Sequence, residues 1–134
     1  MRLCGVEPGV VPEQTLRIRQ PDEAQSLIDK AVADFGGLDI LVNNAGGLGG
    51  RSRFEVMTTE FYRFVMALNL DSVFFASRAA IPFLKVGDNP TIINYTSNAG
   101  WNAGGPGAGI YGTSKAGVHA ITRALAKDLA EYGI

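Results

Sequence analysis

Residues Ile92 to Lys115 read IINYTSNAGWNAGGPGAGIYGTSK, and this stretch gives the clearest indication of the fold. The apolar run Ile92–Tyr95 predicts a buried strand. The glycine-rich segment after it predicts a loop, which leads into a helix that begins near Tyr111. Tyr111 and Lys115 are four residues apart, so the helix places both on one face, one turn from each other.

The side chains on either side of this loop have the chemistry of a proton-transfer site. Tyrosine titrates near pH ~10, so a phenol alone is a poor base at neutral pH. An ammonium group one turn away, that of Lys115, favours the phenolate form of Tyr111. The hydroxyl of Ser97, which follows the strand, could share a substrate oxygen with the phenol. A Tyr-x-x-x-Lys pair is common by chance, so the neighbouring motifs decide its meaning.

Four motifs occur along the chain in a fixed order: NNAG at Asn43–Gly46, Asn69 in ALNLDSVFF, S-x-x-G at Ser97–Gly100, and the pair Tyr111 and Lys115. This ordered set, at these spacings, resembles the short-chain dehydrogenase/reductase family. The resemblance covers roughly Asp22 to Ile134. It implies an enzyme that interconverts an alcohol and a carbonyl compound with NAD or NADP, on a Rossmann-like fold.

The resemblance also implies a catalytic role for four residues. Tyr111 is similar to the acid/base of the family, and Lys115 to the partner that favours the phenolate and holds the nicotinamide ribose hydroxyls. Ser97 resembles the serine that orients and polarises the substrate carbonyl. Asn69 resembles the asparagine that anchors a water between the lysine and solvent. A plain structural hydrogen bond remains a rival explanation for Asn69, because a polar residue among apolar neighbours needs a partner.

Cofactor contacts are implied by the resemblance for Asn43, Ala45, Gly46, Tyr111 and Lys115. The motif Asn43–Gly46 steadies the central sheet and borders the cofactor in the family, and for Asn43 we expect a mostly structural role. The family's T-G-x-x-x-G-x-G phosphate loop has no counterpart in this sequence. Two outcomes therefore stay open: the chain binds NAD or NADP, or it binds no cofactor by itself.

Two functions from different classes follow from this pattern. The first is a short-chain oxidoreductase acting on a small-molecule alcohol or carbonyl substrate, either in an unusual assembly or as a fragment of a longer reading frame. The second is a non-catalytic relic or fragment that acts as an oligomerising or partner-binding module. The sequence names neither the substrate nor the choice between NAD and NADP.

Composition excludes several other classes. The 134 residues carry a net charge of −1 without a block of either sign, which argues against nucleic acid and anionic membrane surfaces as partners. The single Cys4 cannot form an internal disulfide, so we expect a reduced, cytoplasmic environment. The apolar stretch Ser72–Leu84 is too short to span a bilayer, and no leader peptide is expected. No cluster has metal-ligand spacing, and His119 is expected to be a surface or packing residue.

The coarse order of elements predicts an α/β fold. An irregular or partly disordered arm is expected over residues 1–20, in which Thr15–Arg19 could form a short strand. A partial short-chain dehydrogenase/reductase domain is expected over residues 21–134. Its first helix has apolar residues at helical spacing over residues 24–35, with Pro21, Asp22 and Glu23 suiting its N-terminus. Thr58 is a plausible N-cap for the long helix. The remaining elements are a strand Leu38–Val42, this long helix from about Glu60 to Leu84, which could bend near Pro82, a strand Thr91–Thr96, and a helix Tyr111–Tyr132.

This alternation predicts an incomplete Rossmann-like three-layer α/β unit with a parallel sheet and right-handed crossovers. The strand Leu38–Val42 would lack a neighbour on one side, and an open apolar edge invites another strand. The helix from Glu60 is apolar nearly all round, which is typical of a helix buried on more than one side. We therefore expect a homo-oligomer, a dimer or larger.

Overall fold

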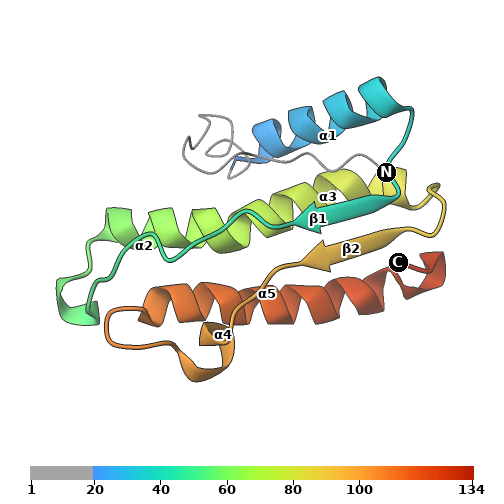
Figure 1. Cartoon of the computed structure of the whole chain (residues 1–134). Helices are drawn as coiled ribbons and strands as arrows, with labels where there is room; N and C mark the ends of the chain where they lie inside the picture. Colours follow the sequence, from blue (N-terminus) through green and yellow to red (C-terminus); the bar gives the residue numbers. More distant parts are fainter. Residues whose placement is uncertain (1–19) are drawn as a thin grey trace.

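Two short parallel strands lie at the centre of the chain (Figure 1). The computed structural model describes residues 20–134, so the predicted strand Thr15–Arg19 and nearly all of the expected arm lie outside the described residues. β1 (Ile40–Asn43) pairs with β2 (Thr91–Asn94), with Ile40 opposite Thr91 and Asn43 opposite Asn94. The adjacent parallel strands expected from the sequence are confirmed.

The helices begin and end where local sequence signals place them. α1 (Pro21–Phe35) has proline in its first turn together with Asp22 and Glu23, whose charges suit a helix N-terminus. It ends at Gly36, which adopts φ +82° and donates its N–H to Val32 O at 2.8 Å. The remaining helices are α2 (Thr59–Met66), the π-helical segment η3 (Ala67–Asp71), α3 (Ser72–Leu84), α4 (Ala99–Asn102) and α5 (Gly109–Asp128), with short 3-10 turns at η2 (Phe54–Val56) and η4 (Ala130–Tyr132).

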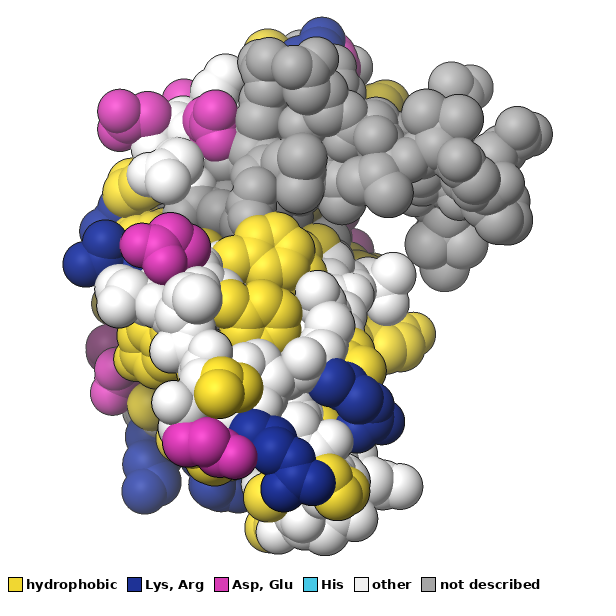
Figure 2. Space-filling model, turned by 90° about the vertical axis from the view of Figure 1, so that its left-hand side faces the viewer, with side chains coloured by type: hydrophobic (Ala, Val, Ile, Leu, Met, Phe, Trp, Pro, Cys, Tyr) yellow, Lys and Arg dark blue, Asp and Glu magenta, His cyan; other side chains and the backbone are white. Residues whose placement is uncertain are grey.

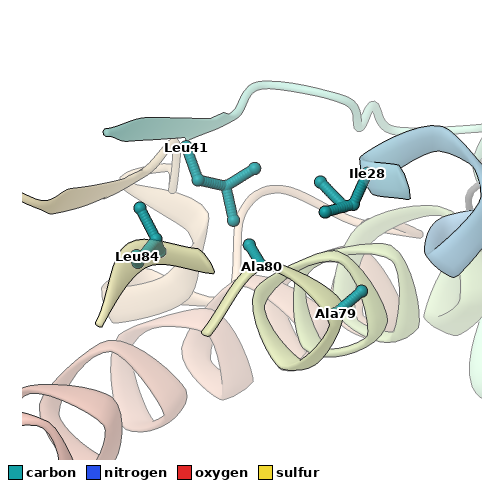
Figure 3. Close-up of a cluster of buried hydrophobic side chains, with 5 residues drawn as sticks. All are labelled: Ile28, Leu41, Ala79, Ala80 and Leu84. Carbon is teal, nitrogen blue, oxygen red and sulfur yellow. The ribbon is translucent and has the colours of Figure 1, made fainter. Parts of the chain in front are cut away.

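The helices and the two strands form two layers. Leu41 of β1 packs into a core with Ile28 of α1 and with α3 side chains; the buried members of this cluster are Ile28, Leu41, Ala79, Ala80 and Leu84 (Figure 3). The alternate strand residues Ile40, Val42 and Ile93 face away from the helices and are about half exposed. Since α3 contacts α1 on one side while η3 and α2 contact α5, the described helices form one continuous layer. The described residues therefore form the incomplete Rossmann-like α/β unit expected from the sequence, with the helices of residues 20–134 on one face of its parallel sheet.

The bounds of three predicted elements are corrected. The strands are Ile40–Asn43 and Thr91–Asn94 rather than Leu38–Val42 and Thr91–Thr96, because only these four-residue segments pair in register. The last helix begins at Gly109, since the helical hydrogen bond from Gly112 N to Ala108 O (2.9 Å) forms before Tyr111. It ends at Asp128, and a separate 3-10 turn follows.

The long central helix runs without a break from Thr59 to Leu84, close to the predicted Glu60–Leu84. Thr58 caps it by accepting a hydrogen bond from Phe61 N at 3.1 Å. This helix has 26 residues and contains an 18-residue window with a mean hydropathy of 1.4, so by length and composition it could cross a bilayer, which the shorter stretch Ser72–Leu84 did not suggest. We interpret it as a core helix, because it packs between α1, α5 and the strands.

Candidate active site

Lys115 is a buried cation at the edge of the sheet. It lies on α5 with 4% of its surface exposed, and its Nζ donates a hydrogen bond to Tyr95 O at 2.9 Å. Tyr95 directly follows β2, so the ammonium group lies at the carboxyl ends of the strands, where open α/β sheets bind ligands. Burial lowers the pKa of Lys115 below 10.5, because desolvation penalises the charged form. The bond to Tyr95 O is the one hydrogen bond that Lys115 Nζ makes within the described residues, so two of its N–H donors remain for a ligand.

Asn69 reaches the same place from the middle of the long helix. Its side chain is fully buried and makes three hydrogen bonds: Oδ1 accepts from Gly47 N (2.9 Å), and Nδ2 donates to Gly47 O (2.9 Å) and Val65 O (3.0 Å). The surrounding segment η3 is π-helical, a local form that occurs frequently at functional sites. Asn69 therefore fixes the loop after β1 to the central helix.

Gly46 brings these two side chains together. It adopts φ +154°, and a Cβ built on it would lie 2.8 Å from Asn69 Oδ1 and 3.0 Å from Lys115 Nζ. Any larger residue would displace one of the two polar groups. The NNAG motif, Asn69 and Lys115, which lie far apart in the sequence, thus meet around one glycine.

Ser97 and Tyr111 lie on the two elements next to this cluster. Ser97 is half-buried after β2, and its Oγ accepts a hydrogen bond from Ala99 N at 3.1 Å. Tyr111 is half-buried on the first turn of α5, one turn before Lys115. In the described part of the chain its phenol makes no hydrogen bond, so the hydroxyl is free to meet a ligand. That the two hydroxyls share one substrate oxygen stays a prediction.

Asn43 and Ala45 occupy different surroundings. The amide of Asn43 is buried and donates to Ser77 Oγ (3.0 Å) and Asn94 Oδ1 (2.8 Å), so it ties β1 to α3 and β2. Ala45 is half-buried in the loop after β1 and lines a small cavity of about 80 Å³. Asn43 therefore supports the sheet beneath the site, whereas the loop after it borders the site.

A groove of about 460 Å³ opens beside the start of α5, between Arg53–Glu55 and the loop 103–107. The two loops are joined by hydrogen bonds from Ser52 N to Gly107 O (3.0 Å) and from Arg51 Nη1 to Pro106 O (2.9 Å). The molecular face toward which both strands point has hydrophobic side chains at its centre and charged ones around them (Figure 2). A hollow of about 720 Å³ at the opposite ends of the strands contains none of the site residues.

Sequence reasoning missed two features of this arrangement. The π-helical segment adds a residue to one turn around Asn69, and a helical pattern of apolar residues does not reveal such an insertion. The contacts of Gly46 with Asn69 and Lys115 depend on tertiary structure, although a glycine after a strand is itself a signal of close approach.

Comparison with known proteins agrees with this geometry. A family model described as short chain dehydrogenase matches residues 12–134. A carboxyl-CoA reductase from Mycobacterium tuberculosis, (5R,7aS)-5-hydroxy-7a-methyl-1-oxo-2,3,5,6,7,7a-hexahydro-1H-indene-carboxyl-CoA reductase, is 42% identical over 115 residues, which are 84% of this chain and 42% of that protein. The 2-dehydro-3-deoxy-D-gluconate 5-dehydrogenase of Escherichia coli is 40% identical over 121 residues, 90% of this chain and 47% of that protein.

Solved structures give the same result. An NADH-dependent reductase, A1-R′, complexed with NAD superposes with a TM-score of 0.84 and 40% identity, over 87% of this chain and 51% of its own. A short chain dehydrogenase from Burkholderia cenocepacia in complex with NADP superposes with a TM-score of 0.81 and 31% identity, over 88% of this chain and 47% of its own. The chain thus spans about half the length of the relatives it matches.

Proposed function

This chain belongs to the short-chain dehydrogenase family, and we propose that it supplies the proton-transfer half of an NAD(P)-dependent oxidoreductase that interconverts an alcohol and a carbonyl compound. The nicotinamide, when bound, supplies or accepts the hydride. The residues of this chain handle the proton and orient the substrate. Relatives solved with NAD and with NADP support a nicotinamide cofactor without choosing between the two.

Lys115 carries this proposal. A buried ammonium with one protein acceptor, Tyr95 O, and two remaining donors fits a ligand that offers hydroxyl groups, such as the ribose next to a nicotinamide. Lys115 lies one turn of α5 from Tyr111, so a ligand that its ammonium group holds would lie beside the phenol.

In the direction of carbonyl reduction, Tyr111 gives the phenolic proton to the substrate oxygen as the carbonyl carbon gains the hydride. The hydroxyl of Ser97 donates a hydrogen bond to that oxygen and stabilises the charge that develops on it. In the direction of alcohol oxidation the Tyr111 phenolate takes the proton back. Asn69 acts at a distance by holding Gly47, and so Gly46, beside Lys115.

The partner of this chain is proposed to be a second copy of it. Ile40, Val42, Ile93 and Tyr95 expose between 44% and 55% of their surface on the strand face that the described helices leave open. Contiguous apolar surface of this kind is unfavourable in water and favours association. A homo-oligomer is therefore the expected state.

The proposal is tested with reduced nicotinamide mononucleotide, which has the nicotinamide and its ribose but no adenosine. We expect it at millimolar concentration to shift the amide resonances of Gly46, Tyr111 and Lys115 in an NMR titration. Lys115→Met should abolish these shifts, whereas Lys127→Met, on an exposed turn of the same helix, should preserve them. Shifts that are absent, or equal in both variants, would contradict the proposed site.

We expect NADH and NADPH to bind to this chain alone little more tightly than nicotinamide mononucleotide does. The sequence has no glycine-rich phosphate loop, and each missing hydrogen bond to a charged group is worth ~1.5–3 kcal/mol. We therefore expect no binding at micromolar concentration in calorimetry and no turnover. Micromolar binding would show that the chain or its assembly builds a complete dinucleotide site, and Tyr111→Phe should then abolish turnover but spare binding.

A further inference from the structure

His119 lies against the segment that carries Ser97, although the sequence suggested a surface or packing residue. It follows Lys115 by one turn of α5 and is half-buried. Its Nε2 is 2.9 Å from Thr96 Oγ1. Its ring lies 4.5 Å, centroid to centroid, from that of Trp101, the single tryptophan of the chain. One side chain thus contacts both ends of the segment Thr96–Trp101.

Thr96 connects this histidine to the backbone of Ser97. The Oγ1 atom of Thr96 accepts a hydrogen bond from Ser97 N at 2.6 Å. A hydroxyl offers one donor and two acceptor sites, so it can bond to Ser97 and His119 together. The rotamer of Thr96, and with it the direction in which the chain leaves β2, is therefore held from α5.

Gly100 lets the same segment lie directly on the helix. A Cβ at this position would lie 2.9 Å from His119 Cδ2 and 3.0 Å from the carbonyl carbon of Lys115. Real Cβ atoms do not approach so closely, so a side chain here would push the segment away from α5. Glycine at position 100 therefore lets the segment after Ser97 pack closely against Lys115 and His119 on α5.

We propose that His119 is a positioning residue, which holds Thr96–Trp101 against α5 and so fixes Ser97 relative to Tyr111 and Lys115. Ser97 follows β2 whereas Tyr111 lies on α5, and the glycine-rich loop between them does not by itself fix their separation. The hydrogen bond of His119 to Thr96 supplies that constraint next to the site. The inference rests on the function proposed for Ser97.

A simpler role for His119 is to fill space beside Trp101. That role accounts for the ring contact but makes no use of Nε2, whereas the positioning role depends on this atom. A leucine at position 119 retains apolar volume and loses the polar atom, while a glutamine can place a polar group where Nε2 lies. The two variants therefore separate the two roles.

The experiment measures backbone ¹⁵N order parameters in the 134-residue chain and in His119→Leu and His119→Gln. In the wild type we expect residues 97–101 to lie in the rigid range, about 0.85. In His119→Leu their order parameters should fall toward the flexible range, below about 0.6, while those of β1 stay unchanged. His119→Gln should restore the rigid values. The emission of Trp101 gives an independent reading, which should change in His119→Leu and recover in His119→Gln.

Thr96→Val and Thr96→Ser form the matched pair on the other side of the bond. Valine removes the hydroxyl at constant volume and should mobilise residues 97–101, whereas serine should not; this pair decides the matter if His119→Leu fails to fold. Equal order in His119→Leu and His119→Gln, or a wild-type segment that is already flexible, would overturn the proposal. Neither reading requires a cofactor, so failure here is distinct from failure of the nicotinamide mononucleotide titration.

Discussion

Replacing Gly46 by alanine should destabilise the chain by roughly 2–4 kcal/mol. The new methyl group would lie 2.8 Å from Asn69 Oδ1 and 3.0 Å from Lys115 Nζ, at a φ of +154° that L-residues rarely adopt. The backbone conformation costs about 1–3 kcal/mol. Displacing the Asn69 amide weakens at least one hydrogen bond, at about 0.5–1.5 kcal/mol. The two costs add, because one arises in the backbone of residue 46 and the other in the hydrogen bonds of the Asn69 side chain.

Urea unfolding followed by far-ultraviolet circular dichroism measures this loss. Gly47→Ala is the matched control, since a Cβ on Gly47 meets nothing within 4 Å and the substitution should cost less than about 0.5 kcal/mol. Gly46→Ala should also cost less in a Lys115→Ala background, where one of the two clashes is gone. Equal midpoints for Gly46→Ala and Gly47→Ala would refute the close packing of Gly46, Asn69 and Lys115.

Three further predictions concern the buried polar groups and the open strand face. Asn69→Ala removes three hydrogen bonds and takes both of these partners from the half-buried Gly47 backbone, so the free energy of unfolding in urea should fall by about 2–4 kcal/mol. A loss below about 1 kcal/mol would contradict the contacts described. Burial lowers the pKa of Lys115 below its unfolded value of 10.5, so between the folded and unfolded pKa the unfolded chain binds more protons than the folded chain. The free energy of unfolding, relative to that of Lys115→Met, should therefore rise as pH increases through the folded pKa toward 10.5. An equal change in the urea midpoints of both proteins between about pH 7 and 10 would contradict this expectation. Val42→Lys on the open strand face should lower the mass measured by light scattering, whereas Val86→Lys, 85% exposed and away from that face, should not; an unchanged mass in both variants would argue against association through this face.

The fold could be predicted largely from local patterns. Apolar runs located both strands, and the helix-start signals at Pro21 and Thr58 placed α1 and α2 to within one residue of their observed starts. The strand ends shifted because pairing, not composition, decides where a ladder stops. The exposure of one strand face within residues 20–134 could not be foreseen from apolar content, since Ile40 and Val42 are as apolar as the buried Leu41.

The candidate site was predictable in its residues but less so in its contacts. Asn69 and Lys115 were identified by motif, and the structure adds that Gly46 lies between them. Asn43 was expected to be structural, and its amide bonds to Ser77 and Asn94 now specify what it supports. The sequence predicts only a surface or packing role for His119, because its partner Thr96 is 23 residues away along the chain.

The π-helical segment η3 also keeps the two halves of the long helix in phase. An extra residue in a regular α-helix would rotate everything after it by about 100° around the axis, whereas a π-helical turn takes up that residue locally. Val65 before the segment and Ala80 after it are accordingly both fully buried. Deleting one residue between Ala67 and Asp71 would restore a regular helix and leave the buried face of α3 in place, but it would remove the wide turn from which Asn69 bonds to Gly47. The extra residue therefore serves the site and not the packing of the helix.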